Sequence, residues 1–302
     1  MNNNKTRLNE FINSPYKSLW SLSFPMMAGM AVQGIYMMID TAFIGKWVGE
    51  NALAGLGYVF PLLFILIGIT FGIGTGVTTV IAQLIGGGGI SDVKETYIQT
   101  VWIGIFLSIL SIFLGIIFAD KIILFQGADT SSLNQASIFF RIMLIGSPFM
   151  IFGVFFRSIL SGEGDNYFPM KVFGLGTLIN IILDPLFILY FGIAGAALAT
   201  IISQFIVFIL FLKKFINNQS LINFRIIPMN INKKLLFEII KIGLPASLSM
   251  LIMSFGVLFY NILLNDPNAV AALQTAGRIE HIFLLPIISI ATSMVTLVGM
   301  FY

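Results

Sequence analysis

The sequence contains no cysteine and only one histidine among its 302 residues. The lack of cysteine excludes disulfide frameworks, thiolate metal sites and cysteine nucleophiles. The single histidine, His281, has no second histidine at ligand spacing, so a zinc site is not expected. The chain also carries no Ser-His-Asp set, metalloprotease motif or dinucleotide-binding fingerprint. We therefore do not expect an enzyme.

Charged residues are scarce as well. They make up 10% of the chain and hydrophobic residues 58%, whereas soluble proteins are about one quarter charged and half apolar. Charge-free apolar runs recur along the chain, several as long as the roughly 20 residues that a membrane-spanning helix needs. The net charge of +3 does not indicate nucleic-acid binding, because the basic residues lie at the ends of these runs. Composition predicts an all-α, polytopic integral membrane protein embedded in a lipid bilayer.

The runs predict about eight transmembrane helices joined mostly by short loops. Most Lys and Arg residues then fall on the side of the amino terminus, with Lys46 and Lys121 opposite. The positive-inside rule places the amino terminus in the cytoplasm. Two short helices over 51–91 would instead put the basic cluster between Lys213 and Lys234 outside, which the rule disfavours. The expected helices are 18–45, 51–85, 93–119, 134–158, 167–190, 194–216, 235–264 and 269–302.

An internal repeat divides the chain into two parts. Residues 22–28 (LSFPMMA) resemble 242–248 (IGLPASL), and residues 51–56 (NALAGL) resemble 268–273 (NAVAAL) at nearly the same offset. Six helices separate the copies, and an even number makes the repeats parallel, as in many secondary transporters. The expected domains are a complete six-helix amino-terminal lobe (1–216), a cytoplasmic linker (217–234) and the first two helices of a carboxy-terminal lobe (235–302).

Asp40 and Asp184 are the clear acidic residues within the predicted spans. An ionisable group at membrane depth costs at least a few kcal/mol and is a functional candidate by default. Asn180 lies one turn before Asp184 on the same helix face, and Gln33 and Tyr36 are spaced to share a face with Asp40. The alternative is a structural role, for Asp40 that of an interfacial residue.

Polar residues of the sixth predicted helix can reach the same outer region of the membrane. They are Thr200 and, one turn deeper, Ser203 and Gln204. Two carboxylates together with amide, phenol and hydroxyl oxygens suit either a bound proton or an oxygen-coordinated cation such as sodium. The spacing of these residues does not choose between the two ions.

Two further features are weaker candidates. A methionine-rich stripe on the first helix, which includes Met37, would give an adaptable wall for apolar ligands, although such residues more often face lipid or neighbouring helices. Arg278 and Glu280, near the start of the eighth helix, are either a second-lobe polar site or an interfacial ion pair.

Several motifs, in this order, resemble the multidrug and toxic compound extrusion (MATE) family. Phe24-Pro25, residues 39–45 (IDTAFIG) and residues 52–57 (ALAGLG) resemble the opening of its members. Residues 162–165 (GEGD) and 180–185 (NIILDP) resemble their fourth loop and fifth helix. The likeness covers essentially the whole chain and is greatest to the DinF-like and archaeal branch.

In that family, twelve helices form two six-helix lobes around a central cavity. The resemblance implies secondary active efflux of amphipathic, often cationic, compounds across the cytoplasmic membrane of a prokaryote. It also implies alternating access coupled to entry of a proton or sodium, with no other cofactor. The residues that it assigns are Asp40, Asn180, Asp184 and Thr200 for the coupling ion, with Gln33 and Tyr36 in the cavity wall. Met37, from the methionine-rich stripe, completes the residues expected to line the cavity.

Compared with that family, the chain is expected to be truncated after about eight of twelve helices. The remaining helices would come from a longer chain or from a partner. One alternative function is a lipid-linked oligosaccharide flippase of similar architecture, which should have a strongly cationic cavity. Another is a non-transporting membrane scaffold, which the incomplete second repeat favours. Asp40 and Asp184 favour cation export over the flippase.

Overall fold

The structure, a computed structural model, describes residues 14–217, 220, 231–264 and 266–301, and every regular element within these ranges is an α-helix. All eight expected helices are found, most of them extending a few residues beyond the expected bounds. Residues 50–86 form one helix, as predicted. The helices are α2 (Pro15–Trp47), α3 (Glu50–Gly86), α4 (Ile90–Phe125), α5 (Thr130–Gly162), α6 (Tyr167–Phe191), α7 (Ile193–Ile216), α8 (Lys233–Leu264) and α9 (Pro267–Phe301).

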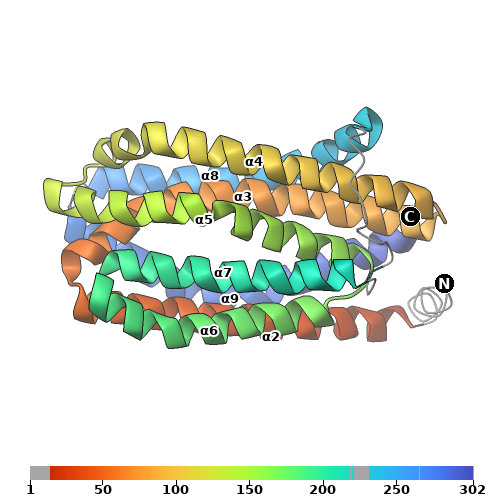
Figure 1. Cartoon of the computed structure of the whole chain (residues 1–302), viewed down its shortest axis with the longest axis horizontal. Coiled ribbons are helices and arrows are strands. Elements are labelled where there is room, and N and C mark those ends of the chain that lie inside the picture. The colour runs from red at the N-terminus through yellow and green to blue at the C-terminus, as the bar shows by residue number, and fades with distance from the viewer. Residues whose placement is uncertain (1–13, 218–219, 221–230, 265, 302) are drawn as a thin grey trace.

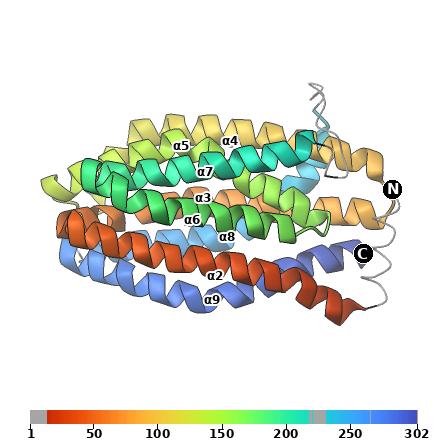
Figure 2. The same cartoon turned by 60° about the horizontal axis from the view of Figure 1, so that its bottom comes forward.

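The helices run lengthwise through one bundle (Figure 1). Within the described residues, seven spans are long and apolar enough to cross a membrane, in α3 to α8 and at 283–300 of α9. α2 has 33 residues and lies along α6 and α9 (Figure 2). The chain is therefore a multi-pass, all-α membrane protein. We call the end at which α2 and α4 begin and α7 and α9 end the basic end (Figure 1). Lys17 and Lys94 lie near the starts of α2 and α4, and Lys214 lies near the end of α7.

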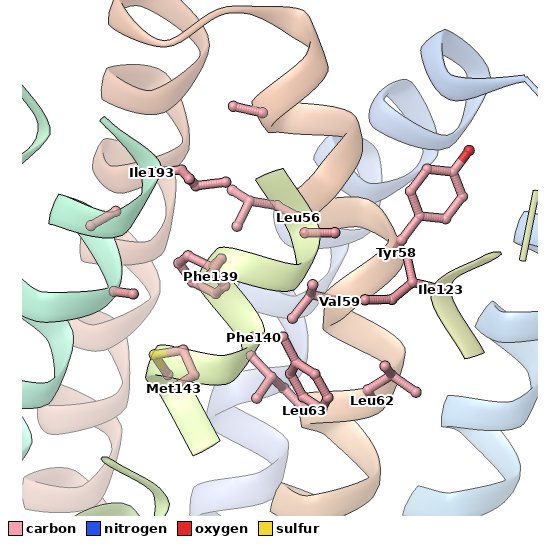
Figure 3. Packing of buried hydrophobic residues seen from close by; sticks show 14 of the residues in the cluster. Leu56, Tyr58, Val59, Leu62, Leu63, Ile123, Phe139, Phe140, Met143 and Ile193 are labelled. Carbon is pink, nitrogen blue, oxygen red and sulfur yellow. The ribbon is translucent and has the colours of Figure 1, made fainter. Parts of the chain in front are cut away.

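α3 lies at the centre and contacts α4, α5, α8 and α9. Toward the end opposite the basic end, Leu56 and Val59 of α3 pack with Phe139 of α5 in a hydrophobic core (Figure 3). Toward the basic end, the core is aromatic and includes Phe156 of α5 and Phe211 of α7, whose ring centroids are 6.3 Å apart. These two cores hold α3, α5 and α7 around the polar interior described below.

α8 packs antiparallel to α3 along most of its length, and we call this contact the seam. Toward the basic end, the seam is made through glycines. A Cβ at Gly72 would lie 2.1 Å from Ser247 Oγ, and a Cβ at Gly243 would lie 2.7 Å from Ile73 Cα. Small residues let membrane helices approach at backbone distance, so this half of the seam is sterically tight.

Toward the opposite end, the seam is polar. Asn261 donates from Nδ2 to the Gly57 carbonyl at 3.1 Å and to Gln126 Oε1 at 3.0 Å. Gln126 in turn donates from Nε2 to the Tyr58 carbonyl at 3.0 Å. Both amide side chains are fully buried. This amide cluster, formed by Gln126, Asn261 and the carbonyls of Gly57 and Tyr58, ties the second repeat to α3 and to the α4–α5 turn.

The expected linker lies between α7 and α8. Its range of 217–234 includes the first two residues of α8, because that helix begins at Lys233. Residues 218–219 and 221–230 lie outside the described part of the chain. Beside that gap, Ser220 donates to Glu163 Oε1 at 2.6 Å and Asn232 donates to Glu95 Oε2 at 2.5 Å. The division into two lobes stays a prediction.

Candidate ion and ligand site

Asp184 and Asn180 lie together on the inner face of α6. The four-residue spacing stacks them one turn apart, and Asn180 donates from Nδ2 to Asp184 Oδ1 at 3.2 Å. Asp184 is completely buried, and Asn180 is 3% exposed. The predicted polar face of this helix is therefore confirmed, and it points into the protein.

Asp40 of α2 lies near these two residues. Its side chain is buried, α2 packs along α6, and Asp40 lines the same cavity as Asn180. Two carboxylates placed this way repel each other when both are ionised. Asp184 Oδ2 and Asn180 Oδ1 are buried and accept no hydrogen bond from the described residues. Because repulsion between buried charges is weakly screened, a proton or a cation between these oxygens would stabilise the arrangement.

A cavity of about 240 Å³ lies beside the carboxylates and is bounded by α2, α3, α5, α6 and α7. Asp40, Asn180, Thr200 and Gln204 form part of its wall, and most of the remaining wall is apolar. Thr200 is half-buried and donates to the Ala196 carbonyl of its own helix at 3.0 Å. All the described lining residues belong to the first six helices, so this cavity lies within the predicted amino-terminal lobe.

The structure brings together four of the residues singled out in the sequence, namely Asp40, Asn180, Asp184 and Thr200. Their role in ion coupling stays a prediction. Gln33, Tyr36 and Met37 lie on α2, but their side chains are outside the described residues. The side chain of Arg278 is also outside them, and Glu280 is exposed on α9.

Two cavity residues were not recognised as such in the sequence. Thr177 is buried in the cavity wall one turn before Asn180, and the spacing of 177, 180 and 184 on one helix face is the signal that would have found it. Arg157 lines the cavity toward the basic end. From the sequence it is only one of the Lys and Arg residues on the side of the amino terminus, and basic residues near helix ends are common.

The loop with the GEGD motif fixes the helices around the site at the basic end. Gly164 has φ of +80°, a conformation that favours glycine. Asp165 accepts the backbone N–H of Phe168 at 3.1 Å and pairs with Lys214 of α7 at 2.6 Å. Asn166 donates to the Leu22 carbonyl of α2 at 3.3 Å. The loop thus connects α2, α6 and α7.

Residues 25–186 match the MatE family over more than half of the chain. The chain belongs to this family. The probable multidrug resistance protein YoeA of Bacillus subtilis (strain 168) is 27% identical over 288 residues, which cover 92% of this chain and 62% of that protein. The multidrug export protein MepA of Staphylococcus aureus (strain MRSA252) is 31% identical over 259 residues, covering 84% and 57%. The chain thus spans less than two thirds of the length of either relative.

Solved structures of MATE transporters share the fold. An outward-facing multidrug resistance MATE family transporter of the MOP superfamily aligns with a TM-score of 0.87 at 30% identity, covering 95% of this chain and 64% of that one. The MATE multidrug transporter DinF-BH, in a ligand complex, aligns with a TM-score of 0.91 at 27% identity, covering 95% and 66%. The resemblance inferred from the motifs is therefore confirmed.

Proposed function

We propose that the protein is an ion-coupled exporter of amphipathic, often cationic, compounds that works by alternating access. We place it in the cytoplasmic membrane of a prokaryote, with its amino terminus in the cytoplasm. Membership of the MatE family and the export activity named for MepA support this proposal. The observation that carries it is the pair of buried carboxylates, Asp40 and Asp184, beside a mostly apolar cavity.

The coupling ion is a proton or sodium. Asp40, Asp184, Asn180 and Thr200 supply oxygen atoms for either ion, and the ion offsets the repulsion between the two carboxylates. A cationic ligand beside Asp40 offsets the same repulsion. The ion and the ligand therefore compete for the pair, and by linkage each lowers the affinity of the other. Exchange of one for the other, with different affinities in two conformations, is antiport.

The remaining cavity wall suits varied apolar ligands. Phe60, Phe173, Met143 and Met150 are among the residues that line it. Aromatic rings offer large apolar surfaces, and methionine side chains adapt to different shapes. The partners in this proposal are small amphipathic molecules and the lipid bilayer, with the remaining helices of the family fold supplied by a longer chain or a partner. No nucleic acid and no enzymatic step is involved.

The charged residues of the cavity wall help to distinguish export from the flippase alternative. Among the described lining residues, Arg157 is the only basic residue and Asp40 the only acidic one. A flippase that holds a pyrophosphate-linked substrate should present several cations. A wall with a single cation does not match that expectation, and the buried Asp184 beside the cavity favours export of compounds that carry positive charge.

The test is dye efflux from proteoliposomes that contain the purified protein, with a proton or a sodium gradient imposed separately. The wild type should export the cationic dye ethidium with one of the two gradients, which identifies the ion. Asp40→Asn and Asp184→Asn should each lose the gradient-dependent part. Asp120→Asn is the matched control, because Asp120 is an exposed residue that pairs with Arg141 away from the cavity. Undiminished efflux by both site variants would contradict the proposal.

A further inference from the structure

Arg157 lies at the basic-end limit of the cavity. It is half-buried on α5 and lines both the main cavity and a smaller pocket of about 30 Å³ between α2, α5 and α6. Its guanidinium carbon is 5.2 Å from the centroid of the Phe71 ring. The aromatic face offsets part of the cost of removing the cation from water. Arg157 is thus held at the floor of the cavity.

No carboxylate of the described residues lies within ion-pair distance of this guanidinium. The two acidic residues nearest in sequence are engaged elsewhere: Glu163 accepts from Ser220, and Asp165 pairs with Lys214. The comparison with Lys214 is informative, because that buried cation has a carboxylate at 2.6 Å. A guanidinium offers five N–H donors in a planar fork that fits a carboxylate. Arg157 therefore presents an unused anion-binding group to the cavity.

Arg157 and the carboxylates near Asn180 lie at different levels along the helices. Phe156, next to Arg157, packs on Phe211, and Phe211 packs on Phe173 of α6 at 5.6 Å. Arg157 is therefore near the level of Phe173, which is seven residues before Asn180 on α6. Seven residues correspond to about 10 Å of axial rise. Between these levels the wall is mostly apolar but includes Thr177, with a carboxylate toward one end of the cavity and a guanidinium toward the other.

We propose that Arg157 is a second recognition point, which binds the carboxylate of a zwitterionic amphiphile whose cationic end lies near Asp40. This inference rests on the proposed export function, because it adds a class of compound to the same cavity. The apolar wall holds the body of the ligand, and each charged end meets a group of opposite sign. Compounds with a cation but no anion bind without using Arg157.

Equilibrium binding of two matched dyes to the purified full chain in lipid nanodiscs tests this directly. One dye is the ethyl ester of rhodamine B, which is a cation, and the other is rhodamine B itself, which has the same ring system plus a free carboxylate. Fluorescence polarisation gives the Kd of each. Because charge-assisted bidentate hydrogen bonds are strong, Arg157→Gln should raise the Kd of the free acid about tenfold or more. The Kd of the ester should change by less than about threefold, within the uncertainty of such contacts.

Two variants serve as controls. Arg157→Lys keeps the charge but not the planar fork, so it should weaken the free acid by less than Arg157→Gln does. Arg141→Gln removes an arginine from the same helix, where it pairs with Asp120 at 2.6 Å outside the cavity, and should leave both dyes unchanged. Should Arg157→Gln fail to fold, the lysine variant still has to show a larger loss for the free acid than for the ester.

The outcomes separate this inference from the proposed function. Equal weakening of both dyes would make Arg157 a structural residue and overturn the inference alone. Failure of the wild type to bind either dye would overturn both proposals. The binding measurement uses no ion gradient, so a failure of ion coupling at Asp40 and Asp184 leaves its result unaffected.

Discussion

Two buried polar clusters in the protein differ in charge. The amide cluster at the seam is neutral, and the amide nitrogens of Gln126 and Asn261 donate at 3.0 to 3.1 Å. The carboxylate cluster (Asp40, Asn180, Asp184 and Thr200) contains two acids, which repel each other when both are ionised. Each cluster also has a buried oxygen that accepts no hydrogen bond from the described residues, Asn261 Oδ1 in the first and Asp184 Oδ2 in the second. Both lie within the bundle, yet only the second borders the cavity.

The difference indicates two physical roles. Buried polar groups that are hydrogen-bonded stabilise a contact and make it specific. A buried acid whose oxygens are not all paired is costly, and binding of a proton, a cation or a ligand reduces that cost. We therefore expect the amide cluster to hold the two repeats together and the carboxylate cluster to respond to ions. Mutations in each cluster test these two expectations separately.

The largest effect is expected in the glycine half of the seam. Gly243→Val would drive side-chain atoms into the backbone of α3, because even a Cβ there would be 2.7 Å from Ile73 Cα. We expect a loss of about 3 kcal/mol of stability or of all folded protein. Thermal unfolding in detergent measures it. Gly256→Val on the same helix is the control, because a Cβ there meets nothing within 4 Å. Similar losses for both variants would mean that the seam is not tight.

A smaller loss is expected from the amide cluster. Asn261→Leu removes the donor to the Gly57 carbonyl and to Gln126 Oε1, and we expect it to cost about 1–3 kcal/mol. A double-mutant cycle with Gln126→Met should give a coupling energy above about 0.5 kcal/mol. Response of the unfolding temperature to ions should be unchanged. Strictly additive losses of stability for the two substitutions, or a changed response of the unfolding temperature to ions, would contradict the structural role of the amide cluster.

The turn that carries Gln126 provides a third test. Asp129 caps α5 and accepts hydrogen bonds from the Ser131 hydroxyl and, at 3.1 Å, from the Ser132 N–H. These bonds lower the pKa of Asp129 from 3.8 to about 2. Because the residue is exposed, Asp129→Ala should cost only about 0.5–1 kcal/mol at neutral pH.

The sign of the pH dependence follows from this lowered pKa. The stabilisation by Asp129 is present above its ordinary pKa of 3.8 and is lost as the pH falls through about 2. The unfolding temperatures of the wild type and Asp129→Ala should therefore differ near neutral pH and converge toward pH 2. A difference that grows on acidification would contradict the capping role.

The smallest change in stability is expected at the carboxylate cluster. Asp184→Asn keeps an oxygen for Asn180 Nδ2 and removes the repulsion with Asp40. Stability in the absence of ligand should stay within about 0.5 kcal/mol of wild type or rise, while stabilisation by the coupling ion should disappear. Unfolding temperatures with and without the ion measure both. A loss as large as that of Asn261→Leu would mean that Asp184 is structural.

Much of the fold could be predicted from the sequence because the bilayer imposes it. Apolar runs of spanning length gave the eight helices, and the four-residue spacing of Asn180 and Asp184 gave their shared face. The proximity of Asp40 to Asp184 depends on how α2 and α6 tilt, which spacing along one helix does not determine. The amide cluster was missed for a similar reason: Gln126 follows the end of α4 and Asn261 lies near the end of α8, where polar residues are ordinary.

The central claim is that an ion and a ligand compete for the Asp40–Asp184 pair, and the most direct test is to measure ion release when a ligand binds. Ethidium is added to the purified protein in weakly buffered solution, and released protons or sodium are counted with a pH indicator or a sodium-selective electrode. The account predicts release of the coupling ion by the wild type and none by the double variant Asp40→Asn with Asp184→Asn. Binding of the dye with no release, or with equal release by the double variant, would contradict it.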